Sequence, residues 1–386
     1  MFSHLLKFIK NRECLSIGGV FLIMGTLFGN WATLIPVIKT KFQLDDARLG
    51  LIILCLPVGA ALANPLSTWF IHKYGMQRMT ILGFTGMCLF YLLPVLAPAA
   101  WLVACALFLT GTSIAFTNVS MNTCASALEH QLKEHIMATC HGLFSLGLMI
   151  GSLASSTMIG LSFRPIVQSL LISAVLIFLG IFLKENILSI KDEDHSDPSL
   201  KRPRFSLPKG PLLIMILIAM CTNMTEGSMA DWSAVYMRDI VHSAAYTLGW
   251  GLAAYSFSMA LGRFFGDYWI PKYGANNVLT YGGLLSAIGI GLAVIFPSTF
   301  LCVLAFSMVG LGVSCGAPIL YGAAARLPNL AKGVGLASLN TYSVATFLGG
   351  PVIIGFISTA INLRVALALI SLIGLLWVFL TSKIKL

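Results

Sequence analysis

The sequence predicts an all-α polytopic membrane protein with twelve transmembrane helices in two pseudo-symmetric six-helix bundles. Of its 386 residues, 58% are hydrophobic and only 10% are charged, whereas about a quarter of the residues in a typical soluble domain are charged. The apolar residues come in runs of about 20, which is the length that crosses a bilayer as a helix. The two halves of the chain also repeat one another.

Twelve apolar runs are separated by short turns and by one long polar segment. The predicted spans cover residues 14–38, 48–71, 79–97, 100–127, 136–160, 164–184, 211–237, 245–270, 277–297, 299–325, 332–358 and 362–382. The first run follows a basic N-terminal stretch, as in a signal peptide, but it is too long for the apolar part of a cleaved signal. We therefore interpret it as an uncleaved first span.

The polar segment divides the chain into a predicted N-terminal bundle of residues 1–184, a cytoplasmic linker of residues 185–210 and a C-terminal bundle of residues 211–386. If the N-terminus lies in the cytoplasm, 17 of the 24 Lys and Arg residues fall in inner segments and six fall in outer segments. The positive-inside rule then predicts that both termini and the linker are cytoplasmic.

The halves repeat at a constant offset of 199 residues. The matching pairs are Leu49-Gly50 and Leu248-Gly249, Lys73-Tyr74-Gly75 and Lys272-Tyr273-Gly274, Lys133 and Lys332, and Gly151 and Gly350. Trp31 and Trp232 match at an offset of 201. Several pairs at one offset indicate a duplication, and transporters built from repeats bind substrate near the midplane, at the interface between the repeats.

With this arrangement and a repeated basic loop after the second and eighth spans, the chain resembles the major facilitator superfamily over its whole length. The loop of that family reads Gly-x-Leu-x-Asp-Arg-x-Gly-Arg-Arg, and the corresponding stretches here are residues 68–77 and 267–276. His72 and Pro271 replace the family's Asp. The residues that remain are Lys73, Gly75, Lys272 and Gly274, and the resemblance implies a structural or gating role for them.

Three further segments resemble a branch of bacterial inner-membrane transporters that is similar to the fucose permeases. They are Asn30-Trp31-Ala32-Thr33, His141-Gly142-Leu143-Phe144-Ser145-Leu146-Gly147, and Glu226-Gly227-Ser228 with Asp231-Trp232. The resemblance implies alternating access, sugar-like substrates and a location in the bacterial cytoplasmic (inner) membrane. Asn118 stands at the position of an acid that is implicated in proton coupling in the fucose permeases.

Two acids lie inside the predicted seventh span, where a charged side chain costs roughly 2.5–3.5 kcal/mol on insertion scales. Glu226 falls near the midplane and shares a face with Asn223. Asp231 lies about 7.5 Å further along the helix and about 140° around it. We predict proton coupling by Glu226, and substrate hydrogen bonding or a place in the outer gate for Asp231. Structural acids that pair with an arginine or cap backbone groups are the alternative.

Polar groups on other spans are further candidates. Asn118 and Asn122 form a polar stripe on the fourth span, which predicts either substrate binding or hydrogen bonds between helices. His141, at a similar depth, is either a proton-coupling residue or a packing residue. Asn340 is the counterpart of His141 at the offset of 199, with Tyr342 nearby, and both are predicted to bind substrate.

Trp31 and Trp232 occupy equivalent sites, each beside a polar neighbour, Asn30 or Asp231. Such rings either stack on a sugar or anchor a helix at the membrane interface, and we favour the first interpretation. These four residues are therefore predicted to line the substrate site.

Arg263 lies inside the eighth span, one helical turn from Asp267. We favour a structural or gating pair between the two, and a clamp for an anionic substrate is the alternative. Separately, small-residue motifs predict close helix contacts. These motifs are Gly25-x-x-x-Gly29, Gly147-x-x-x-Gly151, Gly262-x-x-x-Gly266 and Gly312-x-x-x-Gly316.

Other classes of function are disfavoured by the sequence. The net charge of +10 reflects basic loops on one side of the membrane, so we expect no nucleic-acid partner. The chain has no phosphate loop, zinc-ligand spacing or nucleophile constellation, so we expect neither an enzyme nor a metal or cofactor.

We predict a monomer that transports a small polar solute, such as a sugar or sugar derivative, together with protons. A proton-driven exporter of drugs or metabolites is the alternative. The Gly-Pro pattern typical of the fifth helix of such exporters is missing from residues 142–160, which favours import. A non-transporting membrane sensor is a second alternative, but the longest polar segment is too short for a cytoplasmic domain.

Overall fold

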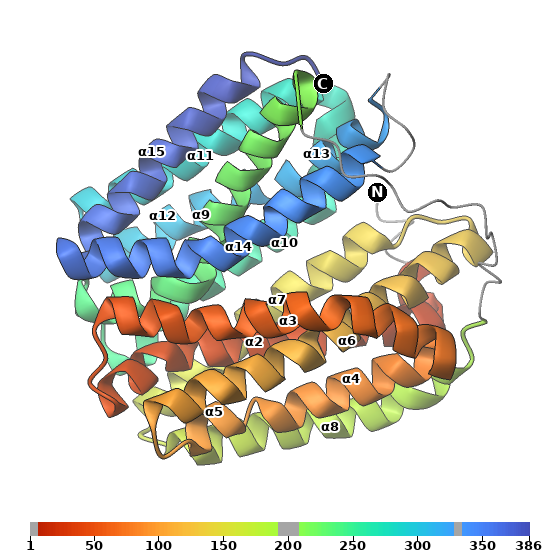
Figure 1. Ribbon diagram of the computed structural model, residues 1–386, viewed down its shortest axis with the longest axis horizontal. Coiled ribbons are helices and arrows are strands. Elements are labelled where there is room, and N and C mark those ends of the chain that lie inside the picture. Colours follow the sequence, from red (N-terminus) through yellow and green to blue (C-terminus); the bar gives the residue numbers. More distant parts are fainter. Residues whose placement is uncertain (1–6, 192–207, 328–333) are drawn as a thin grey trace.

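The computed structural model describes residues 7–191, 208–327 and 334–386, and the regular structure in these residues is helical. Helices suit a bilayer because each one satisfies its backbone N–H and C=O groups within a single segment. Figure 1 shows two bundles that lie against each other, one coloured red to yellow-green and the other green to blue. The predicted all-α fold of two bundles is confirmed.

The N-terminal bundle contains α2 (Arg12–Lys41), α3 (Asp46–Tyr74), α4 (Met76–Phe90), α5 (Leu93–Leu96), α6 (Ala100–Leu132), α7 (Met137–Gly160) and α8 (Pro165–Leu188). The C-terminal bundle contains α9 (Pro211–Asp239), the 3-10 helix η1 (Ala245–Thr247), α10 (Trp250–Tyr273), α11 (Ala275–Ile295), α12 (Thr299–Val313), α13 (Gly316–Ala325), α14 (Val334–Ala360) and α15 (Leu363–Thr381). α8 continues to Leu188, beyond the predicted end of its span at residue 184. Residues 192–207 of the predicted linker lie outside the described residues.

Eleven helical segments in the described parts of the chain are long and apolar enough to cross a membrane. α10 is the helix at the position of the eighth predicted span. Its 24 residues give a length of about 36 Å, which is sufficient for a bilayer. It is not among the eleven, and Arg263, Asp267 and Lys272 lower its hydropathy.

Two predicted spans are each divided by a proline. Pro94 has no N–H to bond the carbonyl of Phe90, and α4 ends at that residue. The hydroxyl of Thr110 on α6 donates to this freed carbonyl oxygen at 3.2 Å. Pro318 has the same effect on the carbonyl of Ser314, at the break between α12 and α13. The hydroxyl of Thr110 therefore replaces the missing backbone hydrogen bond at the first of these two breaks.

The two bundles make equivalent contacts with each other. A Cβ on Gly50 of α3 would lie 2.5 Å from the carbonyl oxygen of Pro351 on α14. A Cβ on Gly249, just before α10, would lie closer than 3.0 Å to the carbonyl oxygen of Ser152 on α7. Gly50 and Gly249 are 199 residues apart, as are Ser152 and Pro351. The repeat therefore extends to the contacts between the bundles, and the repeated Leu-Gly pair marks where they touch.

These contacts lie toward the end of the molecule that carries the α2–α3, α9–α10 and α14–α15 connections, on the left of Figure 1. We call it the closed end. The linker end, opposite, carries the start of α2, the end of α8, the start of α9 and the end of α15. The hydrogen bonds described at the linker end stay within one bundle, as between Gln77 and Ile190 or between Asn276 and Ile384.

α2 and α7 pack closely through four glycines, as the small-residue motifs predict. A Cβ on Gly25 or Gly29 would lie closer than 3.0 Å to a backbone oxygen of α7. A Cβ on Gly147 or Gly151 would meet backbone oxygens of α2 in the same way. With no side chain between them, the two backbones approach closely enough for extensive van der Waals contact, which holds helices together in lipid.

The two basic loops adopt the same local structure. Gly75 has φ +87° and ψ +147°, and Gly274 has φ +81° and ψ +147°. The ammonium of Lys73 lies 4.9 Å from the ring centroid of Trp69, and that of Lys272 lies 5.1 Å from the ring of Tyr268. Each loop thus reverses the chain at a glycine and holds its lysine over an aromatic ring one turn earlier.

We expect Gly274→Ala to destabilise the protein by about 1–3 kcal/mol, because the backbone region of Gly274 suits glycine almost exclusively. A Cβ there would have no atom within 4 Å, so strain alone would cause the loss. Gly322→Ala is the matched control, since its Cβ would make only a 3.8 Å contact inside α13. Thermal unfolding in detergent should show a lower melting temperature for Gly274→Ala only. Equal melting temperatures for both variants would contradict the strain argument.

Candidate functional site

Arg263 of α10 connects the two bundles near the middle of α9. Its Nη2 lies 3.7 Å from Oε1 of Glu226 on α9. Its Nη1 donates to Oγ of Ser145 at 2.8 Å and to the backbone oxygen of His141 at 3.2 Å, both on α7. The side chains of Arg263 and Glu226 are 16% and 29% exposed, so both are partly screened from solvent. One guanidinium therefore holds the acid of its own bundle and the backbone of the other.

Two more groups complete this central cluster, which consists of His141, Ser145, Glu226, Tyr255 and Arg263. The Tyr255 side chain is 1% exposed, and its hydroxyl has no hydrogen-bond partner among the described residues. It interacts electrostatically with Glu226 and Arg263. The His141 ring packs edge-on against Phe21, with the ring centroids 5.2 Å apart.

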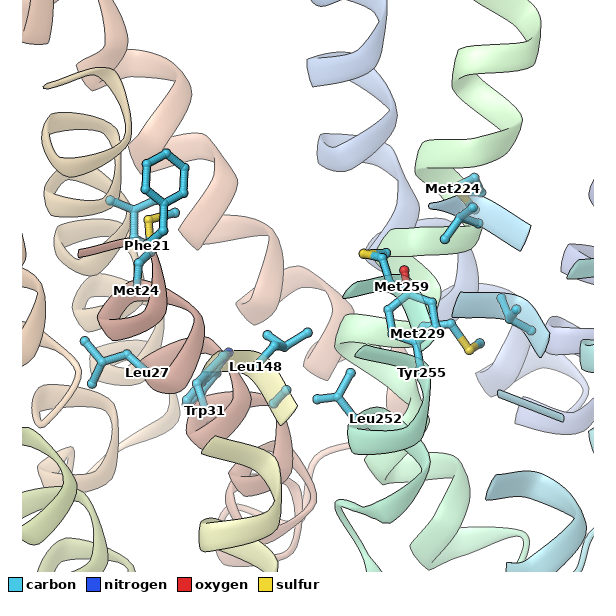
Figure 2. Packing of buried hydrophobic residues seen from close by; sticks show 14 of the residues in the cluster. Phe21, Met24, Leu27, Trp31, Leu148, Met224, Met229, Leu252, Tyr255 and Met259 are labelled. Atoms are coloured by element: carbon cyan, nitrogen blue, oxygen red, sulfur yellow. The ribbon is translucent and has the colours of Figure 1, made fainter. Parts of the chain in front are cut away.

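Figure 2 shows the apolar side chains around this level. Phe21, Met24, Leu27 and Trp31 lie on α2, while Met224, Met229, Tyr255 and Met259 lie on the C-terminal bundle. Three of the labelled side chains on that bundle are methionines, whose flexible thioethers adapt to different neighbours. The polar groups of the central cluster are therefore set in an adaptable apolar surface.

The predicted pair between Arg263 and Asp267 stays a prediction, because the side chain of Asp267 lies outside what the structure describes. The described carboxylate partner of Arg263 is Glu226. Whether Arg263 pairs with an acid on α9 depends on how α9 and α10 are rotated toward each other.

Asn30 lies inside the N-terminal bundle. Its side chain is 2% exposed, and its Oδ1 accepts a hydrogen bond of 2.8 Å from Nε2 of Gln168 on α8. Gln168 also donates to the hydroxyl of Ser155 on α7. In this conformation the side chain of Asn30 therefore joins three helices of one bundle.

Trp31 and Trp232 are also packed into the core, with 4% and 0% of their surface exposed. Trp31 lies beside Leu148 in Figure 2. The indole Nε1 of Trp232 is buried and has no hydrogen-bond partner in the described parts of the chain. In this conformation neither ring is open to solvent or to lipid at the protein surface.

Asn118 and Asn122 lie one turn apart on α6 and bond each other. The Nδ2 of Asn122 donates to both oxygens of Asn118, at 2.7 and 2.9 Å. Asn118 is exposed although it lies about 180° around α6 from Leu109. Leu109 belongs to a stripe with Trp101 of exposed apolar side chains that suits lipid. The exposed amide of Asn118 therefore lies on the face of α6 opposite to Leu109.

Asn340 and Tyr342 lie in the first half of α14. Asn340 is exposed, and its Oδ1 accepts a long hydrogen bond of 3.4 Å from the hydroxyl of Tyr321 on α13. Tyr342 is half-buried and packs against the core. Asn340 therefore has donor capacity left for a ligand.

A network at the closed end was not among the predicted site residues. Nζ of Lys39 on α2 lies 2.6 Å from Oδ2 of Asp239 on α9 and 2.5 Å from Oδ1 of Asp46 on α3. Arg238 of α9 donates to Oγ1 of Thr40 at 2.5 Å and to the backbone oxygen of Pro36. We call Lys39, Asp46, Arg238 and Asp239 the closed-end network. Lys39 and Arg238 are 199 residues apart, so the repeat was the signal that could have identified them.

Among the described residues, no group of three or more His, Cys, Asp and Glu side chains is arranged to hold a metal ion. In the described residues of the central cluster, the polar side chains are one imidazole, two hydroxyls, one guanidinium and one carboxylate. Such a set suits hydrogen bonding to a small polar molecule.

The sequence matches the family model of the Major Facilitator Superfamily over residues 17–243 and 212–384. An uncharacterised MFS-type transporter of Yersinia pestis is 32% identical over 353 residues, which cover 92% of this chain and 91% of the relative. The membrane protein MosC of Rhizobium meliloti is 28% identical over 367 residues, covering 95% of this chain and 89% of MosC.

Solved structures share the fold at low sequence identity. A mutant form of the nucleoside transporter NupG has a TM-score of 0.76 and 12% identity, covering 97% of this chain and all of that chain. A bacterial homologue of the human lysosomal transporter Spinster has a TM-score of 0.69 and 13% identity, covering 95% of each chain.

Proposed function

Because the chain belongs to the major facilitator superfamily, it is a multi-pass membrane transporter and not an enzyme, and we propose that it symports a small polar solute with protons. The solute is a sugar or sugar derivative. The two bundles alternate between a state that is closed at the closed end, as seen here, and a state that is closed at the linker end.

The observation that carries this proposal is the position of Arg263 between Glu226 and α7. When Glu226 is ionised, it holds the guanidinium toward α9. When Glu226 takes up a proton, the guanidinium loses its anionic partner and keeps only neutral oxygen partners on α7. Protonation therefore changes the balance of contacts between the bundles, which is what coupling requires. Asn118, Asn122 and Asn340 supply hydrogen bonds to the solute in the adjoining space.

The orientation follows from the distribution of basic residues. We propose that both termini are cytoplasmic and that the membrane is the bacterial inner membrane, which makes the state described here inward-facing. The transporter works as a monomer, since one chain supplies both bundles and all members of the central cluster.

Glu226→Gln should abolish proton-driven accumulation, because a neutral amide mimics the protonated carboxyl and cannot release a proton. Proteoliposomes with an inward proton gradient and radiolabelled hexoses and hexosamines test this. The wild type should concentrate at least one solute, and Glu226→Gln should reduce that accumulation at least about tenfold, while equilibrium exchange continues.

Glu13→Gln is the matched control, since Glu13 accepts a hydrogen bond from Ser189 on the surface of the linker end. It should accumulate solute like the wild type. Wild-type accumulation by Glu226→Gln, or wild-type uptake that ignores the proton gradient, would contradict the proposal.

A further inference from the structure

Asp231 is an acid without an ion-pair partner among the described residues. In the middle of the molecule Glu226 is matched by Arg263, and at the closed end two acids are matched by Lys39 and Arg238. No cation of the described residues lies within ion-pair distance of Asp231. A carboxylate in a membrane-spanning helix without a counter-charge is costly and points to a function.

The position of Asp231 is suited to contact a solute. It lies on α9 between the central cluster and the closed-end network, about 7.5 Å from the level of Glu226 and about 12 Å from that of Asp239. Its side chain is partly exposed, whereas the next residue, Trp232, is completely buried. The carboxylate therefore lies beside a buried tryptophan without being completely buried itself.

A buried polar group of the other bundle interacts with Asp231. Tyr91, which ends α4, is 2% exposed, and its hydroxyl has no hydrogen-bond partner among the described residues. This hydroxyl interacts electrostatically with Asp231. A buried hydroxyl without a partner is itself unfavourable, and here it interacts with an acid of the other bundle that has no ion-pair partner among the described residues.

Aromatic rings continue from Tyr91 along the N-terminal bundle. The ring of Phe28 on α2 lies edge-on to Tyr91 at a centroid distance of 6.1 Å, and the ring of Phe144 on α7 lies 6.0 Å from that of Phe28. A carboxylate beside aromatic rings is the combination that binds ammonium groups, because both the charge and the ring faces attract a cation.

We propose that Asp231, together with Tyr91, binds a protonated amine on the transported solute. The inference rests on the proposed function and narrows its solute to amine-bearing polar molecules, such as amino sugars. The ammonium supplies the counter-charge that Asp231 lacks, and a neighbouring hydroxyl of the solute bonds the Tyr91 hydroxyl. The other polar groups of the solute lie toward Asn118 and the central cluster.

Matched solutes test this proposal on the purified full-length protein in detergent at neutral pH. The panel consists of glucosamine, galactosamine and mannosamine, each with its parent hexose and its N-acetyl derivative, which has no charge. At least one amine should raise the melting temperature, and its parent hexose and N-acetyl derivative should not. Equal shifts from the uncharged members, or no shift from any amine, would overturn the proposal.

Variants at the site give a second measurement that needs no solute. Asp231→Asn should remove the amine-dependent shift and should also raise the melting temperature of the solute-free protein by about 2–4 °C, because it removes an unbalanced charge. Asp231→Glu keeps the charge and should retain part of the amine effect. A structural role for Asp231 predicts the reverse, a lower melting temperature for Asp231→Asn with the amine shift intact.

The amine assignment and the proton-coupling assignment can fail separately. Loss of proton-driven accumulation with amine binding retained would refute the role of Glu226 and leave the solute assignment. Proton-driven accumulation of uncharged hexoses alone would refute the amine assignment and leave coupling.

Discussion

Lys39→Ala should raise, about 30-fold, the ratio of molecules that are open at the closed end to molecules that are closed there. Lys39 is 15% exposed and joins Asp239 of one bundle to Asp46 of the other. Removing one partner of a fully buried pair costs about 3–5 kcal/mol, and partial exposure reduces this to about 2 kcal/mol here. Two carboxylates are also left facing each other. Since each 1.4 kcal/mol is a factor of ten, the expected change is about 30-fold.

Hydrogen exchange measured by mass spectrometry can follow this opening. Faster exchange is expected in residues 36–50 and 236–250, which meet at the closed end, and not at the linker end. Lys41→Ala is a matched control, because Lys41 donates to the carbonyl oxygens of Val95 and Ala97 within the same bundle. If both variants exchange alike, the closed-end network does not hold the bundles together.

Gly151→Ala should cause the largest loss of stability, about 3 kcal/mol or more, at the upper end of what overpacking costs. The added Cβ would lie closer than 3.0 Å to the backbone carbonyl of Thr26. A backbone atom cannot turn away as a side chain can, so α2 and α7 would have to separate along their contact. The yield of folded protein and its melting temperature should both fall.

Gly291→Ala provides the comparison for this substitution. A Cβ on Gly291 of α11 would make a normal contact of 3.4 Å with Oγ of Ser371. Alanine also favours the helix over glycine by about 1 kcal/mol, so this variant should be as stable as the wild type or slightly more stable. A similar loss in both variants would mean that the α2–α7 contact is not tight.

The sequence was sufficient for the helices, the two bundles and the glycine contacts, because hydropathy, repeats and residue size act locally. The sequence left open whether Arg263 contacts an acid of its own helix or of another. Asp267 lies one turn away on the same helix, whereas Glu226 lies on α9 and is reached only through the rotation and depth of two packed helices.

The sequence also could not show whether a side chain points into its own bundle or toward the other one. Asn30 and Asp231 are neighbours of equivalent tryptophans, yet Asn30 bonds Gln168 inside its own bundle while Asp231 interacts electrostatically with Tyr91 of the other. The offset between Trp31 and Trp232 is 201, and the offset in the closed-end network is 199. A shift of two residues turns a helix face by about 200°, which is enough to exchange the inside and the outside.

The closed-end network has the form of an isologous interface. Lys39 corresponds to Arg238 in the repeat, and Thr40 corresponds to Asp239. The contact of Lys39 with Asp239 is therefore the two-fold counterpart of the contact of Arg238 with Thr40. Lys39 and Arg238 each contact the equivalent position on the other bundle, as in a dimer of identical subunits related by a two-fold axis. This pair of contacts thus has the two-fold symmetry of a homodimer interface, although both contacts are made within one chain.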